Sequence, residues 1–142
     1  TLLNIDIVDD QVSKEKTDTQ AQEKELDRTL LNELYGDDPD YAFEMFDHFL
    51  KSFENQMEAF NNALNSRDLD EIMRFIHKIK PGFSMVGLPW LQELGSAIES
   101  ACEAGKSEEA LTKGVTFQQK ARQGIILVKA EHQILQSKLK ST

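Results

Sequence analysis

The chain has 142 residues, of which 39% are hydrophobic and 29% charged, and its formal net charge is −9. This composition is typical of one globular domain, is too apolar for a wholly disordered chain, and is too acidic to favour binding to nucleic acid or anionic lipid. No apolar run is long enough for a membrane span, and the single cysteine, Cys102, excludes an intrachain disulfide and a site built from several cysteines.

Residues 1–22 are predicted to form a linker or a disordered tail. An apolar start is followed by a long polar stretch, and the alternation at Ile5-Asp6-Ile7 has no nearby strand to pair with. The start lacks the pattern of a signal peptide, and the first residue is Thr rather than Met. We therefore expect a piece of a longer protein, with its folded domain over residues 23–142.

From Leu26 onward the apolar residues recur with the period of an α-helix. A short amphipathic helix is predicted to end at Gly36, which tolerates the left-handed conformation of a helix terminus. Asp38 and Pro39 predict the start of a second helix that runs to about Asn65. Its apolar stripe, which we expect to be core, consists of Phe46, Phe49, Phe53, Met57, Phe60 and Leu64.

Three more helices follow, separated by short breaks. Asp68, with Glu71 three residues later, predicts the start of a third helix that runs to about Val86. A fourth helix is expected from Pro89 to Gly105, and a last long helix from residue 107 to about residue 140. Four long amphipathic helices with short connections predict an all-α, antiparallel up-down-up-down four-helix bundle, which the short first helix would cover.

The third helix carries the chemically interesting residue, His77. At about 100° per residue, most of the helix's apolar side chains fall on the side opposite His77, so the imidazole is expected to point away from the core. Arg74 and Lys80 flank it on the same face, and their positive charge would attract a phosphoryl group and stabilise its transferring oxygens. A solvated basic stripe without function is the alternative interpretation.

The residues around His77 suggest access for a partner. Pro81, Gly82 and Ser84 are compact, and Pro81 removes the hydrogen bond that the His77 carbonyl would normally accept, so a local kink or widened turn is expected there. Met73 and Phe83 are apolar residues near His77 that suit transient docking, unless a neighbouring helix covers them.

The segment from His77 to Gly87 resembles the signature of histidine-containing phosphotransfer (HPt) domains. That signature has His, an aliphatic residue at +2, Lys at +3, small residues from +4 to +7 and Gly at +10, and the resemblance covers about residues 26–140. One departure is Pro81, where the family usually has Gly, with Gly82 next. This departure concerns the backbone near His77 rather than the identity of the acceptor.

The resemblance implies a phosphoryl carrier rather than an enzyme. His77 would accept a phosphoryl group from a receiver-domain phospho-aspartate and pass it to another receiver, while magnesium and most catalytic groups belong to the receiver. Lys80 would stabilise the phosphoryl charge, and Gly87 would serve the helix geometry. Supporting roles are expected for Arg74 and Ser84, and docking roles for Met73, Lys78 and Phe83.

The expected setting follows from the same resemblance. We expect a monomer without cofactor or metal and without direct membrane or nucleic-acid contact. It would act in the cytoplasm, as part of a hybrid sensor histidine kinase that can itself be membrane-bound.

Three alternatives remain open at this point. The first is a His module of the chemotaxis-kinase type, phosphorylated directly by an ATP-binding kinase domain. The second is a bundle that docks a receiver without transferring phosphate. The third, a helical enzyme or metal protein, is disfavoured because His48, His77 and His132 fall on three different predicted helices; His48 and His132 are expected to be surface residues.

Overall fold

The computed structural model describes residues 25–140, so the predicted tail over residues 1–22 lies outside the described residues. The described part contains five helices and no strand, as the sequence predicts. The helices are α2 (Arg28–Tyr35), α3 (Pro39–Ser66), α4 (Leu69–Met85), α5 (Pro89–Glu103) and α6 (Ser107–Lys140). No helix in this range combines the length and the hydropathy that a membrane span requires.

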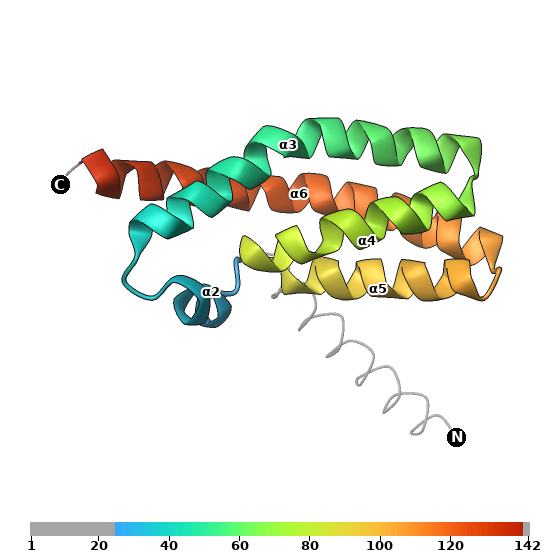
Figure 1. Cartoon of the computed structure of the whole chain (residues 1–142), viewed down its shortest axis with the longest axis horizontal. Helices are drawn as coiled ribbons and strands as arrows, with labels where there is room; N and C mark the ends of the chain where they lie inside the picture. Colours follow the sequence, from blue (N-terminus) through green and yellow to red (C-terminus); the bar gives the residue numbers. More distant parts are fainter. Residues whose placement is uncertain (1–24, 141–142) are drawn as a thin grey trace, which may run out of the picture.

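Helices α3 to α6 form a four-helix bundle in which successive helices run in opposite directions (Figure 1). Helix α4 packs against α3 and α5, and α6 packs against the same two neighbours, so α4 and α6 lie diagonally across the core. The N-terminal part of α3 and the C-terminal part of α6 extend beyond the α4–α5 turn, and α2 lies at that end of the bundle. The predicted up-down-up-down bundle with a short covering helix is therefore confirmed.

Side-chain caps fix where three of the helices begin. Asp27, Asp38 and Asp68 each accept a hydrogen bond from the backbone N–H three residues downstream, at 3.0–3.2 Å. Gly36 and Gly105 follow the ends of α2 and α5 with φ values of +52° and +70°, a conformation that suits glycine. These caps explain why the predicted boundaries agree closely with the observed ones.

The core is rich in aromatic rings. All six residues predicted for the apolar stripe of α3 are buried. The Phe117 ring of α6 meets Phe60 and Phe83 edge-on, with ring centres 5.5 and 5.4 Å apart. Burying one such side chain contributes roughly 1.5–3 kcal/mol to stability. These ring contacts therefore hold α4 against α3 and α6 through Phe83.

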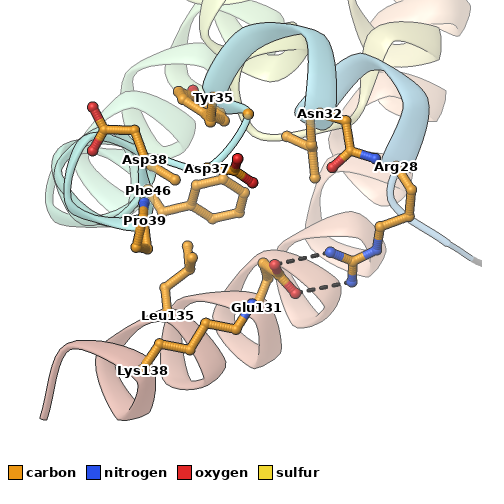
Figure 2. A pocket seen from close by; sticks show the side chains of 13 residues that line it. Arg28, Asn32, Tyr35, Asp37, Asp38, Pro39, Phe46, Glu131, Leu135 and Lys138 are labelled. Carbon is orange, nitrogen blue, oxygen red and sulfur yellow. Dashed lines mark hydrogen bonds and ion pairs between the residues drawn. The ribbon is translucent and has the colours of Figure 1, made fainter. Parts of the chain in front are cut away.

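Helix α2 is joined to the bundle by specific polar contacts. The Asp27 N–H donates to the Gly87 carbonyl at 2.8 Å, and the Tyr35 hydroxyl donates to the Met85 carbonyl at 2.5 Å. The Arg28 guanidinium bonds both carboxylate oxygens of Glu131, at 2.9 and 2.8 Å (Figure 2). Glu131 is the only buried charged residue in the described range, and its hydrogen bond raises the pKa of Arg28. These contacts join α2 to both α4 and α6.

Candidate functional site

The imidazole of His77 stands on the outer surface of α4. Its side chain is 79% exposed, whereas Ile72, Ile76 and Ile79 of the same helix are buried in the core. The expectation that His77 points away from the core is confirmed. The ring is therefore open to solvent on the surface of the bundle.

A carboxylate from the next helix lies beside the ring. Glu99 of α5 places Oε1 3.4 Å from Nδ1 of His77 and Oε2 2.9 Å from Nζ of Lys80. Its side chain is only 16% exposed, and Oε1 has no hydrogen bond of good geometry within the described residues. A buried carboxylate oxygen facing a ring nitrogen favours a proton on that nitrogen. Glu99 thus faces His77 and Lys80 at the same time.

Lys80 is held against α5 instead of extending into solvent. Its side chain is 18% exposed, and its ammonium donates to Glu99 and to the Ser96 hydroxyl, at 2.9 and 3.2 Å. Gly95 makes this close approach of α5 possible, because a Cβ there would lie 3.2 Å from a methyl carbon of Ile76 and 3.3 Å from the Cβ of Lys80. The cation beside His77 is therefore positioned by packing between α4 and α5.

The basic patch that the sequence predicts is only partly present, because two of its three cations are paired with carboxylates. Arg74 is paired with Glu71 at 2.7 Å, and Lys80 is paired with Glu99. Lys78 is exposed and forms no ion pair within residues 25–140. A small open pocket beside the imidazole is lined by Asp70, Met73, Arg74, His77, Glu99 and Glu103. The surface toward the start of α4 is therefore of mixed charge rather than basic.

The family model of the Hpt domain matches residues 44–135 of the sequence, a range that includes His77, Lys80 and Glu99. The chain belongs to the Hpt domain family. The phosphorelay intermediate protein rdeA of Dictyostelium discoideum is 24% identical over 87 residues, which make up 61% of this chain and 34% of that protein. The match thus spans about a third of the relative's length. No solved structure matches the chain at a significant level.

In this Hpt domain, the compact residues that follow His77 on α4 were expected to leave room for a partner, but two of them make contacts within the bundle. Helix α4 continues through Pro81 to Met85, so the kink expected at His77 stays a prediction. Gly82 faces α3, because a Cβ there would lie 3.3 Å from the Phe49 ring. Its small size therefore serves packing inside the bundle. The Ser84 hydroxyl donates a hydrogen bond to Oε1 of Gln92 on α5.

Gly87 ends α4 with a backbone that only glycine adopts readily. Its φ is +86°, and an added Cβ would lie 3.0 Å from Leu26 and 3.1 Å from Leu31. The turn after α4 and the contact with the segment of α2 therefore both need a residue without a side chain.

The three predicted docking residues do not share one environment. Lys78 is exposed, and Met73 is half-buried at the pocket beside His77. Phe83 is only 2% exposed and packs edge-on against the Phe49 ring at 5.3 Å. The expectation that Phe83 forms part of a docking surface is wrong, because rings from α3 and α6 enclose it.

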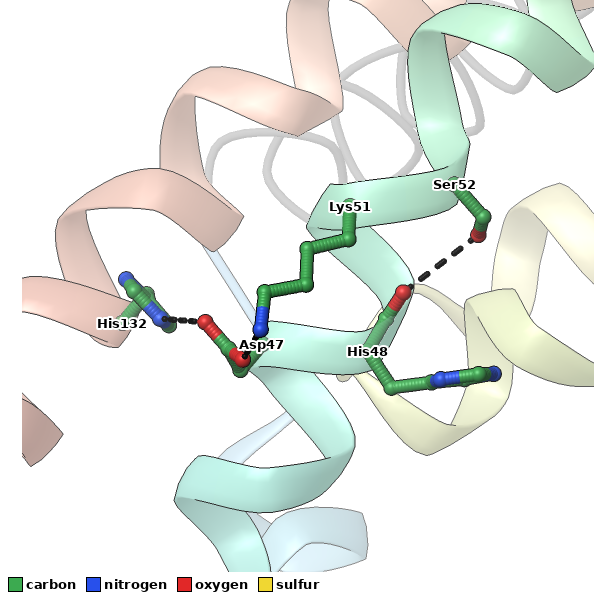
Figure 3. A network of polar contacts seen from close by, with 5 residues as sticks. All are labelled: Asp47, His48, Lys51, Ser52 and His132. Atoms are coloured by element: carbon green, nitrogen blue, oxygen red, sulfur yellow. Dashed lines mark hydrogen bonds and ion pairs between the residues drawn. The ribbon is translucent and has the colours of Figure 1, made fainter.

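The other two histidines lie on different faces (Figure 3). His48 is exposed on α3, as expected. His132 was expected to be exposed, but its side chain is only 20% exposed, stacks on Phe43 and places Nε2 3.0 Å from Oδ1 of Asp47. The part of the chain that the structure describes holds no group of three or more His, Cys, Asp or Glu residues able to bind a metal ion.

Proposed function

We propose that this Hpt domain is a phosphorelay intermediate that accepts a phosphoryl group on His77 from the phospho-aspartate of a receiver domain and passes it to a second receiver. The observation that carries the proposal is the exposed imidazole of His77, held beside Glu99 in a chain of the Hpt family. The relationship to a protein named a phosphorelay intermediate supports it. The setting we propose is the cytoplasm, as a domain of a hybrid sensor histidine kinase.

The contact with Glu99 selects the reactive ring nitrogen. A neutral imidazole carries one N–H and one lone pair, and the nearby carboxylate favours the proton on Nδ1. The lone pair then lies on Nε2, which attacks the phosphorus atom. The new N–P bond replaces the P–O bond of the acyl phosphate, and the receiver's aspartate leaves with the electron pair. Glu99 stabilises the positive charge that develops on the ring.

Lys80 supplies positive charge near the phosphoryl group. Its ammonium is already held on the His77 side of α5 by Glu99 and Ser96. We propose that it turns part of its hydrogen bonding toward the phosphoryl oxygens when the N–P bond forms. Arg74 and Lys78 are proposed to add a weaker, screened attraction, since Arg74 is paired with Glu71 and both side chains are solvent-exposed.

The domain is proposed to be a carrier rather than an enzyme. Its contribution to transfer is an accessible nucleophile with a fixed proton and a nearby cation, so catalysis depends on positioning and charge. The groups that activate the phospho-aspartate would be supplied by the receiver. Met73 and Lys78, which border His77 on the accessible side, are the proposed docking residues.

The direct test is transfer from a radiolabelled, phosphorylated receiver to the chain. We expect an acid-labile label on the wild type and none on His77→Gln, because amide nitrogen cannot replace the imidazole nucleophile. His48→Gln is the matched control, since it changes an exposed histidine of α3 by the same substitution and should be labelled normally. Circular dichroism should show equal helicity in all three proteins.

The outcome that would contradict the proposal is a label of undiminished strength on His77→Gln. A second assay with a kinase core and ATP in place of the receiver separates the relay from direct phosphorylation by a kinase. Transfer from the receiver and none from the kinase core is the result that we expect.

A further inference from the structure

The pocket beside His77 lies along the seam between α4 and α5. Four side chains of α4 and two of α5 line it: Asp70, Met73, Arg74, His77, Glu99 and Glu103. The α4 residues repeat at i, i+3, i+4 and i+7 and the α5 residues at i and i+4, so each set lies on one face of its helix. The pocket has a volume of about 400 Å³. It is therefore a recess between two helices, large enough to hold one long side chain of a partner.

The contact between Glu99 and His77 fixes how the two helices are aligned along the pocket. Oε1 of Glu99 lies 3.4 Å from Nδ1 of His77. Because α5 runs antiparallel to α4 (Figure 1), Glu103 is displaced from Glu99 toward the start of α4, by about 6 Å at 1.5 Å per residue. Asp70 lies in the same direction, about 10 Å from His77 along α4. The end of the pocket away from His77 is therefore bordered by one carboxylate from each helix.

These two carboxylates have no cationic partner in the described part of the chain. Asp70 and Glu103 are exposed and form no ion pair or side-chain hydrogen bond within residues 25–140. The charge of Arg74, the one cation among the described residues that line the pocket, is offset by Glu71 at 2.7 Å. Glu99 has its own ammonium partner at 2.9 Å. The pocket therefore keeps two negative charges that its lining residues leave uncompensated.

The thiol of Cys102 on α5 lies in the field of the same carboxylates. Burial is the first cause that raises its pKa, and the negative charges of Glu99, Asp70 and Glu103 raise it further. Asp70 belongs to α4, whereas the other two carboxylates belong to α5. Carboxylates from both helices therefore act on one region, and their negative potential adds up at this end of the pocket.

The uncompensated charge affects which phosphorylated partner can approach His77. A phosphoryl group is itself negative, and Asp70 lies about 10 Å from His77 along α4, close to the screening length of about 8 Å at physiological salt. A partner with an acidic residue at the pocket would be repelled, whereas one with a basic residue would be attracted. Met73 adds a half-buried apolar surface between the carboxylates and His77. An aliphatic stem with a charged head, as in lysine or arginine, matches this combination.

We propose that the receiver domain which exchanges phosphate with His77 inserts one lysine or arginine side chain into this pocket. The charged head lies between Asp70 and Glu103, and the aliphatic stem packs on Met73. This inference rests on the proposed function and specifies its partner as a receiver with an exposed basic residue about 10 Å from its phospho-aspartate. Asp70 and Glu103 select among receivers and take no part in the chemistry at the imidazole.

Transfer kinetics with a phosphorylated receiver that loads the wild type test this selection. Asp70→Asn combined with Glu103→Gln removes both charges and keeps both shapes, so KM for the receiver should rise about 5-fold at an unchanged maximal rate. Glu44→Gln combined with Glu58→Gln is the matched control, since it makes the same change of charge at exposed carboxylates of α3 and should leave KM unchanged. A KM that stays the same or falls in the pocket variant would overturn the inference, because a fall would mean that the carboxylates only repel the receiver.

An exchange of charges between the partners identifies the inserted side chain. Each exposed lysine or arginine around the phospho-aspartate of that receiver is replaced in turn by glutamate. One replacement should weaken loading of the wild type and be partly restored by Asp70→Lys, because opposite charges then meet again across the interface. If no replacement is restored, the inference is wrong while the proposed function stands. If no phosphorylated receiver loads the wild type, the proposed function is wrong and the inference falls with it.

Discussion

His77 and His132 make similar contacts with very different surroundings. Each has a ring nitrogen within 3.4 Å of a carboxylate on a neighbouring helix, Glu99 for His77 and Asp47 for His132. The His77 side chain is 79% exposed, whereas the His132 side chain is 20% exposed and stacked on Phe43. A histidine–carboxylate contact therefore does not mark a reactive site by itself. We propose that side-chain exposure distinguishes the phosphoryl acceptor His77 from the structural contact at His132.

The contrast is tested most strongly by the same substitution at both histidines. We expect His77→Ala to abolish phosphoryl uptake and leave the free energy of unfolding nearly unchanged, because an exposed side chain is lost. His132→Ala should take up phosphate normally and lose about 1–2 kcal/mol of stability with its hydrogen bond and ring stacking. Transfer assays and urea unfolding measure the two effects. Impaired uptake in a folded His132→Ala would mean that the two sites are coupled.

The next largest effect is expected at Lys80, the cation that we propose stabilises the phosphoryl group on His77. Lys80→Ala should slow transfer roughly 100-fold, the order expected when one charge-stabilising donor is removed. Its free energy of unfolding should also fall by about 1–3 kcal/mol, because the Glu99 side chain, only 16% exposed, would lose its ion-pair partner. Rapid-quench kinetics would measure the rate. An unchanged rate would show that the lysine only joins α4 to α5.

Glu99→Gln is expected to have a smaller effect on the same reaction. The amide keeps the shape of the side chain but loses the charge that fixes the Nδ1 proton and stabilises the ring, so we expect transfer about 10-fold slower. The matched variant Glu71→Gln removes an exposed carboxylate that pairs with Arg74 and should change the rate little. Equal rates for the two variants would remove Glu99 from the account.

How much of this could be predicted from the sequence depends on the range of the interactions. Helix boundaries depend on local features such as the Asp38 and Asp68 caps, and the stripe of α3 follows from helical period, so both were predictable. The Glu71–Arg74 pair is also local, and its spacing could have warned that the basic patch was incomplete.

The residues that could not be predicted correctly from the sequence have positions set by the packing between helices. Glu99 follows Lys80 by 19 positions and reaches it only because Gly95 lets α5 approach α4. A helical wheel places Phe83 at the edge of the core but cannot show that rings of α3 and α6 cover it. The burial of His132 likewise requires the long overlap of α3 and α6. Such contacts are set by tertiary packing and leave no periodic signal.

The smallest predicted effect concerns the contact between Asp47 and His132 and how its contribution to stability depends on pH. The pKa of Asp47 is held below its usual value first by the hydrogen bond from Lys51 and then by that from His132. A lowered pKa stabilises the fold above the unfolded-state pKa of about 3.9, and this contribution is lost as the pH falls through the folded-state pKa. Asp47→Asn should therefore lower the melting temperature slightly at pH 7 and less at about pH 2. An equal difference at both pH values would contradict this origin.

The atom that carries the phosphoryl group is the most direct test of the proposed phosphotransfer. Phosphorus-31 and nitrogen-15 NMR of the chain after loading by a phosphorylated receiver can identify it. We predict one phosphoramidate signal with the phosphorus bonded to Nε2 of His77, and Nδ1 still protonated beside Glu99. A phosphorus bonded to Nδ1, or to any residue other than His77, would contradict the account.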